Sequence, residues 1–174
     1  MKKLQEGDRA IILPLKSTFG TLNTERYFKK WLILFFYPKD FAAGCTLEVK
    51  AFQAKLSDIR SYGGDVVGIS PDSVEMHVKY SAELGLDYEL ASDHNGSMAG
   101  LYGAQIKSRL LKFKRKALLI SPQMIIVKSY TNVKISLYAH EIIKDLKFIK
   151  SFDDKLEINN IIKYGSPNQG KTAH

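Results

Sequence analysis

The chain alternates short apolar runs with longer segments in which apolar residues recur at helical spacing. Its most apolar run, Trp31–Tyr37, is flanked by lysines and is too short to span a membrane, so it predicts a buried strand. Pro38 ends this strand because proline cannot donate to a sheet ladder. Downstream, apolar positions at helical spacing predict a helix over Cys45–Tyr62, which ends at Gly63-Gly64.

The remaining segments continue this alternation. Further strands are predicted over Ala10–Leu15, Asp65–Ser70, Tyr88–Ala91, Lys116–Ile120 and Met124–Tyr130, with turns at Ser17–Thr24 and Ser121-Pro122-Gln123. Further helices are predicted over Ser73–Leu84, with Val74 and Val78 on one face, over Ser97–Tyr102 and over Ala139–Phe152. A strand–helix–strand unit followed by a hairpin and a closing helix is a thioredoxin-like order. The predicted fold class is therefore α/β, with a central mixed sheet flanked by helices.

Length and composition fit one compact domain. The chain has 174 residues, of which 45% are hydrophobic and 25% charged, as in ordinary globular proteins. We expect a thioredoxin-like domain over residues 1–152 and a polar, partly flexible tail over residues 153–174. The single cysteine excludes an internal disulfide, and no targeting segment or membrane span is visible, so we expect a cytoplasmic protein.

The net charge of +8 raises the separate question of a nucleic-acid partner. Six basic residues lie within ten positions, namely Lys107, Arg109, Lys112, Lys114, Arg115 and Lys116. No nucleic-acid-binding motif accompanies them, and the neighbouring Leu110, Leu111 and Phe113 are more typical of packing residues than of a base-stacking platform. The cluster is therefore interpreted as solvated surface, and nucleic-acid binding rests on charge alone.

The only cysteine, Cys45, is placed by these predictions at a strand-to-helix junction. Unpaired backbone N–H groups and the helix dipole favour anions at such a position, so they are expected to lower the pKa of the thiol and to raise its thiolate fraction. The alternative is a buried and inert cysteine, which is the usual state of a free thiol. The local context favours a reactive thiolate.

An ordered series of short motifs surrounds Cys45. The series consists of Tyr37-Pro38-Lys39-Asp40, Gly44-Cys45-Thr46-Leu47-Glu48, Val67-Gly68-Ile69-Ser70-Pro71-Asp72-Ser73-Val74-Glu75, Ala91-Ser92-Asp93-His94-Asn95-Gly96, Ala99-Gly100-Leu101-Tyr102-Gly103 and Arg115-Lys116-Ala117-Leu118-Leu119-Ile120. Together the motifs span roughly residues 4–152, and they resemble the peroxiredoxins, most closely the bacterioferritin comigratory or peroxiredoxin Q branch. The resemblance implies a thioredoxin-like fold and a thiol peroxidase activity.

The resemblance also implies a role for each of four residues. Cys45 would be the nucleophile, and Arg115 would hold the thiolate and orient the peroxide, for which its fixed charge and forked donors suit it. Glu48 would anchor Arg115, and Pro38 would shield the cysteine from further reaction. Each also has a structural alternative: Arg115 as one charge in a basic run, Glu48 as a favourable anion near a helix N-terminus, and Pro38 as a strand terminator.

Two positions depart from the family pattern. The family's Pro-x-x-x-Thr-x-x-Cys motif maps onto Pro38 and Cys45, but Ala42 stands where the threonine belongs. That hydroxyl normally bonds the thiolate and the attacked oxygen, and Thr46 points from a different helical position. Lys50 stands where many peroxiredoxin Q proteins carry a resolving cysteine. With no second cysteine, an intramolecular disulfide cannot form.

The sequence therefore predicts a one-cysteine thiol peroxidase, weakened at Ala42, that reduces hydrogen peroxide or organic hydroperoxides through a sulfenic acid on Cys45. Its partners would be the hydroperoxide and an external thiol reductant, which could be thioredoxin, glutaredoxin or a small-molecule thiol, acting on a monomer or homodimer. No cofactor or metal is expected, because the four histidines, His77, His94, His140 and His174, show no metal-ligand spacing. His77, His94 and His140 are expected at the surface. The alternative is a degenerate thioredoxin-fold protein that binds a partner or senses oxidation without significant peroxidase activity.

Overall fold

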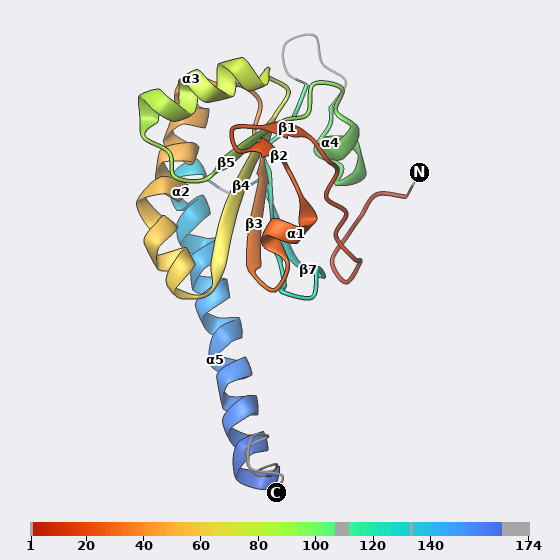
Figure 1. Ribbon diagram of the computed structural model, residues 1–174, viewed down its shortest axis with the longest axis vertical. Helices are drawn as coiled ribbons and strands as arrows, with labels where there is room; N and C mark the ends of the chain where they lie inside the picture. Colours follow the sequence, from red (N-terminus) through yellow and green to blue (C-terminus); the bar gives the residue numbers. More distant parts are fainter. Residues whose placement is uncertain (1, 107–111, 133, 165–174) are drawn as a thin grey trace, which may run out of the picture.

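A seven-stranded mixed sheet organises the structure, which is a computed structural model describing residues 2–106, 112–132 and 134–164, with side chains as far as Phe152 (Figure 1). The sheet order is β2-β1-β5-β4-β3-β6-β7. The strands are β1 (Lys16–Ser17), β2 (Gly20–Thr21), β3 (Trp31–Phe36), β4 (Gly64–Ser70), β5 (Glu89–Ser92), β6 (Lys116–Ile120) and β7 (Ile126–Thr131). The helices are α1 (Thr24–Tyr27), α2 (Ala43–Ser61), α3 (Val74–Leu84), α4 (Ser97–Leu101), the short 3-10 helix η1 (Ile135–Leu137) and α5 (Tyr138–Tyr164). The predicted α/β class with a central mixed sheet is confirmed.

Strand β3 contributes to the hydrophobic cores on both faces of the sheet. All of its residues are buried, as predicted from its apolar run. Successive side chains of a strand point to opposite faces. One set, with Ile33 and Phe35, packs in the core that includes residues of α2 and α5. The other set, with Leu34 and Phe36, packs in the core that includes residues of α1 and α4. Burial on both faces explains why the strand is apolar throughout rather than alternating.

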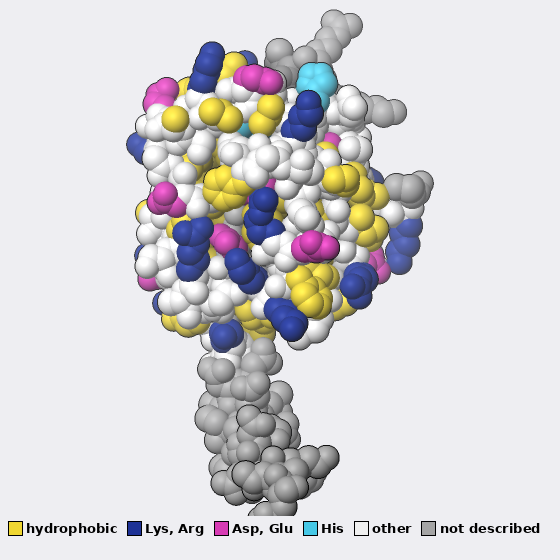
Figure 2. Space-filling model, viewed as in Figure 1, with side chains coloured by type: hydrophobic (Ala, Val, Ile, Leu, Met, Phe, Trp, Pro, Cys, Tyr) yellow, Lys and Arg dark blue, Asp and Glu magenta, His cyan; other side chains and the backbone are white. Residues whose placement is uncertain are grey.

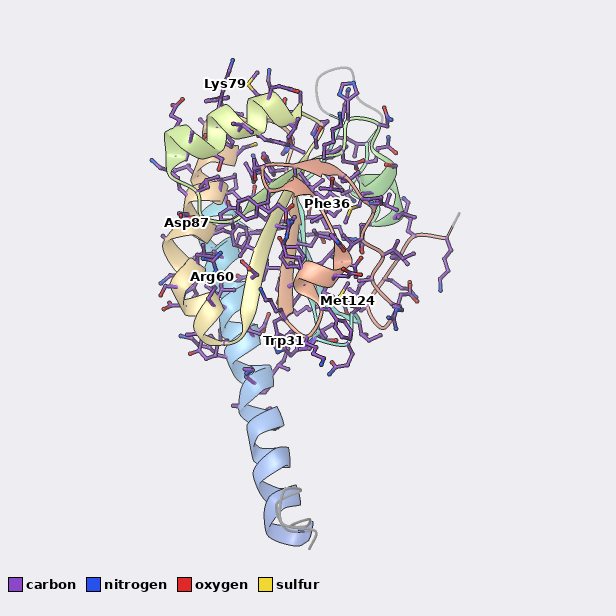
Figure 3. All side chains as sticks on the ribbon, viewed as in Figure 1. Trp31, Phe36, Arg60, Lys79, Asp87 and Met124 are labelled. Atoms are coloured by element: carbon purple, nitrogen blue, oxygen red, sulfur yellow. The ribbon has the colours of Figure 1, made fainter. Side chains whose placement is uncertain are left out.

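The register around β3 brings two distant segments to the same end of the sheet. β3 pairs in parallel with β4 and antiparallel with β6, so Phe36 at its end lies opposite both Ile69 and Lys116. Trp31 and Phe36 mark the two ends of β3 in Figure 3. The chain leaves Phe36 through a short loop into α2, whereas Arg115 immediately precedes β6. The start of α2 and Arg115 are therefore neighbours in space.

A glycine ends each of the helices α2 and α3, and the end of α2 at Gly63 is as predicted. Gly63 follows α2 with a φ of 71°, and Gly85 caps α3 in the left-handed conformation. Only glycine adopts such angles without strain, so the helices end there. In the last turn of α2, the guanidinium of Arg60 donates to the carbonyl of Asp87 at 2.8 Å, which ties α2 to the segment before β5 (Figure 3).

The predicted strand over Ala10–Leu15 is wrong. Within that segment no strand forms, and the first strands are instead the β1–β2 hairpin, which begins at Lys16 and continues into the segment expected to be a turn. The backbone of Ile11 finds its partner in a side chain: the Tyr102 hydroxyl accepts from its N–H and donates to its carbonyl, both at 2.9 Å. Pro14 also lacks a backbone donor. The Tyr102 hydroxyl therefore takes the place of a partner strand at Ile11.

Two helix predictions also need correction. In α3 the buried residues are His77 and Tyr80, whereas Val78 is 51% exposed, so the face that contains Val78 is not the packing face. At the end of the chain, α5 does not stop near Phe152 but continues to Tyr164, as Figure 1 shows. Residues 153–164 of the expected tail are therefore helical. Among the described residues, no helix is both long and apolar enough to cross a membrane.

Candidate active site

Cys45 is the third residue of α2 and is almost fully buried, with 1% of its surface exposed. The predicted position at the junction of a strand and a helix is confirmed. The residue that caps the helix is Ala42, whose side chain cannot accept a hydrogen bond from the first turn. Thr46, one residue beyond the cysteine, bonds instead to the hydroxyl of Tyr80 at 2.9 Å. The threonine does not replace the hydroxyl that Ala42 lacks.

Arg115 reaches the cysteine from the residue before β6. Its Nη2 donates to Cys45 Sγ at 3.3 Å, and its Nη1 donates to the carboxylate of Glu48, one turn further along α2. Gly44 makes this approach possible, because a Cβ on that residue would lie 3.0 Å from Arg115 Nη2. The structure thus brings together three of the four predicted site residues. The fourth, Pro38, lies half-buried in the loop between β3 and α2.

Glu48 is fully buried, and only one of its two carboxylate oxygens is bonded. Oε2 accepts from Arg115, while Oε1 has no hydrogen-bond partner among the described residues. Burial raises the pKa of Glu48 to about 7, although the charge of Arg115 acts in the opposite direction. An unsatisfied buried oxygen is costly, and such atoms often mark functional sites. The carboxylate is the electrostatic partner of an arginine that also contacts the thiol.

The expected low thiol pKa is not what the structure shows. Burial raises the pKa of Cys45 above its ordinary value. A hydrogen bond from the Lys39 backbone and the charge of Arg115 both lower the pKa, and the Glu48 carboxylate raises it again. The helix dipole by itself favours a low pKa, but a thiol that is 1% exposed has also lost the water around it, and this loss favours the protonated form. In this closed arrangement the thiol favours its protonated form more than a free cysteine does.

A second buried polar cluster lies beneath the loop that precedes α2. Asp40 accepts from the Tyr37 hydroxyl at 2.7 Å and bonds His77 Nδ1 at 2.7 Å. His77 Nε2 lies 3.2 Å from the carbonyl of Ala91, and the imidazole has no exposed surface. The predicted surface position of His77 is therefore wrong. A histidine that looked polar on a helix is buried because Asp40, 37 residues away, supplies its partner.

The other three histidines are His94, His140 and His174. His94 is exposed and lies 3.2 Å from the carbonyl of Pro71, and His140 is exposed on α5, so both are at the surface as predicted. His174 lies outside the described residues. Within the described part of the chain, no group of three His, Cys, Asp or Glu side chains is placed to hold a metal ion.

The basic cluster is only partly described, since Lys107, Arg109, Leu110 and Leu111 lie outside the described residues. Phe113 is fully buried and its ring packs edge-on against Phe36, so its interpretation as a packing residue is confirmed. Lys116 donates to the carbonyl of Tyr102 at 2.7 Å. On the face drawn in Figure 2, lysines and arginines are spread among acidic and hydrophobic side chains rather than gathered into a stripe.

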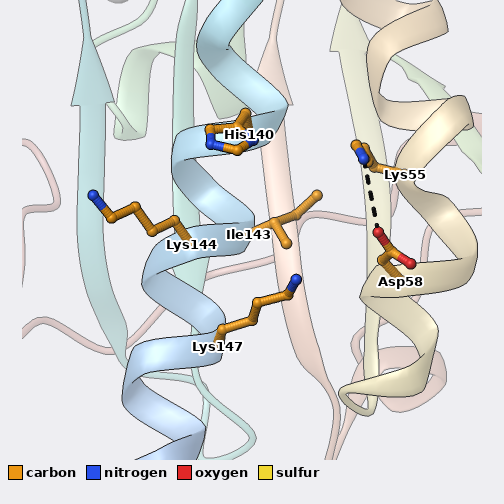
Figure 4. Close-up of a pocket in the computed structure, with 6 residues that line it drawn as sticks. All are labelled: Lys55, Asp58, His140, Ile143, Lys144 and Lys147. Atoms are coloured by element: carbon orange, nitrogen blue, oxygen red, sulfur yellow. Dashed lines mark ion pairs between the residues drawn. The ribbon is translucent and has the colours of Figure 1, made fainter.

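A pocket of about 270 Å³ between α2 and α5 offers different chemistry from the Cys45 site (Figure 4). Its lining residues are Lys55, Asp58, His140, Ile143, Lys144 and Lys147. Lys55 forms an ion pair with Asp58 at 3.8 Å. The pocket contains no thiol, and Lys55 follows Cys45 by ten residues, about 15 Å along the helix. We therefore place the candidate chemistry at Cys45.

Comparison with known proteins agrees with this geometry. Residues 7–129 match the model of the AhpC/TSA family, and the chain belongs to that family. A putative peroxiredoxin Bcp from Helicobacter pylori is 34% identical over 152 residues, which are 84% of this chain and 100% of that protein. A peroxiredoxin Bcp from Xanthomonas campestris is 32% identical over 145 residues, covering 78% of this chain and 88% of that protein.

Solved structures extend the agreement to the fold. A cysteine-to-serine variant of peroxiredoxin Q from Xylella fastidiosa superposes with a TM-score of 0.80 at 26% identity, covering 86% of this chain and 99% of that chain. The bacterioferritin comigratory protein of Xanthomonas campestris, studied for its alkyl peroxide reduction activity, superposes with a TM-score of 0.73 at 29% identity, covering 78% of this chain and 90% of that chain. The predicted thioredoxin-like fold and the predicted family are confirmed.

Proposed function

We propose that this protein is a one-cysteine thiol peroxidase that reduces hydrogen peroxide or organic hydroperoxides at Cys45. The observation that carries the proposal is the contact of Arg115 Nη2 with Cys45 Sγ at 3.3 Å, with the other arm of the same guanidinium on the buried Glu48. A fixed positive charge beside a thiol favours the thiolate and faces the oxygen on which charge develops. Membership of the AhpC/TSA family and the peroxiredoxin relatives support the same activity.

The first half of the cycle uses the residues of this site. The Cys45 thiolate attacks one oxygen of the hydroperoxide, and the O–O bond breaks. The cysteine becomes a sulfenic acid, and the second oxygen leaves with a proton as water or an alcohol. Arg115 stabilises both the thiolate and the leaving oxygen, Glu48 holds Arg115, and Pro38 limits access to the sulfenic acid. These roles fit the positions of the side chains and remain proposals for mutagenesis.

The second half of the cycle needs a partner. Cys45 is the only cysteine, so an external thiol must condense with the sulfenic acid to give a mixed disulfide and water. A second thiol then attacks that disulfide and returns Cys45 to its reduced form. A thioredoxin, a glutaredoxin or a small-molecule thiol could supply these electrons. Because the cycle needs a reducing compartment, we propose that the protein works in the cytoplasm.

One observation favours a second candidate function. Ala42 provides no hydroxyl at the cap of α2, and burial raises the pKa of the thiol, so the site lacks two features that speed the attack on peroxide. A slow thiol of this kind would suit an oxidation sensor or a binding protein that keeps the peroxidase fold. A peroxidase and an oxidation sensor differ in the rate at which Cys45 reacts, whereas Cys45 of a binding protein does not react with peroxide.

Intact mass spectrometry tests the proposed peroxidase directly. One equivalent of hydrogen peroxide should add a single oxygen to the protein, and dimedone should trap the product at Cys45. Adding a small-molecule thiol before dimedone should give the mixed disulfide and then the original mass. Cys45→Ala under the same conditions should gain neither oxygen nor dimedone. An unmodified wild-type mass after prolonged exposure would count against the peroxidase and in favour of the binding protein.

A further inference from the structure

The buried histidine of α3 lies outside the chemistry described so far, yet it is bonded on both sides. His77 Nε2 lies 3.2 Å from the carbonyl oxygen of Ala91, which can only accept, so this nitrogen carries a hydrogen. His77 Nδ1 lies 2.7 Å from the Asp40 carboxylate, and an ionised carboxylate also only accepts. His77 therefore bridges Asp40, in the loop after β3, and Ala91 on β5, and both members of the His77–Asp40 pair are buried.

This pair fixes the loop that approaches the cysteine. Asp40 is held at three points: its carboxylate accepts from the Tyr37 hydroxyl and from His77, and its backbone N–H donates to Asp72 Oδ2 at 2.7 Å. The residue before it, Lys39, donates a backbone hydrogen bond that lowers the pKa of Cys45. The position of this donor therefore depends on how firmly Asp40 is anchored.

We propose that His77 is a positioning residue for the Cys45 site, which acts through Asp40 to hold the loop between β3 and α2 that leads to the cysteine. The inference rests on the proposed peroxidase function of Cys45 and adds a residue from α3 to its support. A displacement of about 1 Å at a reacting centre can cost on the order of a hundredfold in rate. The other polar groups around the pair are Tyr37 from the end of β3, Tyr80 from α3 and Asp72 from the loop after β4.

Substituting His77 by asparagine or by glutamine removes one of its two hydrogen bonds at a time. The side-chain nitrogen of asparagine occupies the place of Nδ1, so His77→Asn keeps the donor to Asp40 and loses the one to Ala91. The nitrogen of glutamine occupies the place of Nε2, so His77→Gln keeps the donor to Ala91 and loses the one to Asp40. Both variants remove the ring from the core. A purely structural role would therefore lower the stability of both without separating their effects on Cys45.

The test is the pH profile of alkylation of Cys45 by iodoacetamide, together with the second-order rate constant for hydrogen peroxide. We expect His77→Gln to move the alkylation profile to higher pH and to lower the peroxide rate constant by about tenfold or more. We expect His77→Asn to stay within about threefold of the wild type in rate. Equal profiles for the two variants would overturn the proposal, even if both melt at lower temperature.

Two further outcomes are decisive. If His77→Gln does not fold, Tyr37→Phe replaces it, because this change removes one donor to Asp40 and keeps the ring in the core. Tyr37→Phe should move the alkylation profile in the same direction, and a profile identical to the wild type would contradict the proposal. Alkylation needs no peroxidase activity. A wild type that does not react with peroxide, with alkylation profiles that still differ between the two amides, would refute the proposed function and leave the positioning role intact.

Discussion

Two buried glutamates of this protein share the same kind of partner but differ in how completely they are bonded. Glu89 and Glu48 are both fully buried, and each forms an ion pair with an arginine. Around Glu89, Ser17 bonds one oxygen, while Arg26 and Tyr27 bond the other. Around Glu48, Arg115 bonds one oxygen, and the other has no partner among the described residues. The fully bonded carboxylate stabilises the fold, whereas the half-bonded one lies beside the reactive thiol.

The difference shows that the energetic cost of an unsatisfied buried oxygen lies at the Glu48 cluster beside Cys45. A buried polar network is stabilising when every member is satisfied and costly when one is not. Glu89 anchors the β1–β2 hairpin and α1 to β5, and both of its carboxylate oxygens are bonded within its cluster. Glu48 keeps an unsatisfied oxygen while its arginine donates to sulfur as well. Local rules of stability are commonly broken at functional sites, and the Glu48 cluster follows that tendency.

The largest effect is expected from replacing Arg115 or Arg26, each in a separate variant, by methionine. Arg115→Met removes the donor to Cys45 and should lower the rate constant for hydrogen peroxide by about a hundredfold or more, the usual cost of one oriented donor. Arg26→Met should leave that rate constant unchanged and lower the free energy of unfolding by about 3 kcal/mol, because it leaves Glu89 without its cation. Stopped-flow kinetics and urea denaturation measure the two quantities. Equal rate losses in both variants would erase the distinction between the clusters.

The pH dependence of stability gives the second test. The pKa of Glu48 rises from 4.5 to about 7 on folding, so the folded protein holds this proton more tightly than the unfolded chain does. Its stabilising contribution is therefore fully present below pH 4.5 and is lost as the pH rises through 7. The shift corresponds to about 3 kcal/mol.

Urea denaturation at about pH 5 and pH 8 tests this expectation. The wild type should lose more stability between the two pH values than Glu48→Gln does, because the glutamine has no proton to release. Glu89→Gln is the matched control, because it changes an equally buried carboxylate and keeps Glu48. It should keep the wild-type difference between the two pH values. If Glu48→Gln keeps that difference too, Glu48 does not titrate as described.

Ala42→Thr should give the third and smallest effect. The threonine hydroxyl adds a cap to α2 and a donor near Sγ, so we expect the peroxide rate constant to rise by about tenfold and the free energy of unfolding by about 1 kcal/mol. The melting temperature would increase by about 2–4 °C. Ala42→Ser is the closest control, because it restores the hydroxyl without the methyl group. An increase in stability without any gain in rate would mean that the site lacks more than this hydroxyl.

The position of Cys45 in the fold could be predicted from local patterns in the sequence. An apolar run identified β3, helical spacing identified α2, and their order placed Cys45 at the junction. The contacts of Arg115 could not be derived from spacing, because Cys45 and Glu48 lie 70 and 67 residues away from it along the chain. The resemblance to a family supplied those positions, and the antiparallel register of β3 and β6 accounts for them.

The errors have a common physical cause. The sequence predicts His77 at the surface and Val74 and Val78 on one face of the helix, because periodicity treats a histidine as polar and a valine as apolar. The structure buries His77 through Asp40 and exposes Val78. Similarly, Ala10–Leu15 is apolar enough for a strand, but Tyr102 bonds the backbone of Ile11. In both cases a distant side chain satisfies polar groups, and no local pattern contains that information.

The central claim is that the Cys45 thiol itself reduces peroxide. Stopped-flow mixing of the reduced protein with hydrogen peroxide and with an organic hydroperoxide, followed by Trp31 fluorescence and by loss of free thiol, tests it most directly. Both signals should change together at a rate proportional to peroxide, and the rate should rise with pH above neutrality because burial raises the thiol pKa. Cys45→Ser should show neither change. Peroxide consumption that persists in Cys45→Ser, or a wild-type thiol that is no faster than free cysteine, would contradict the account.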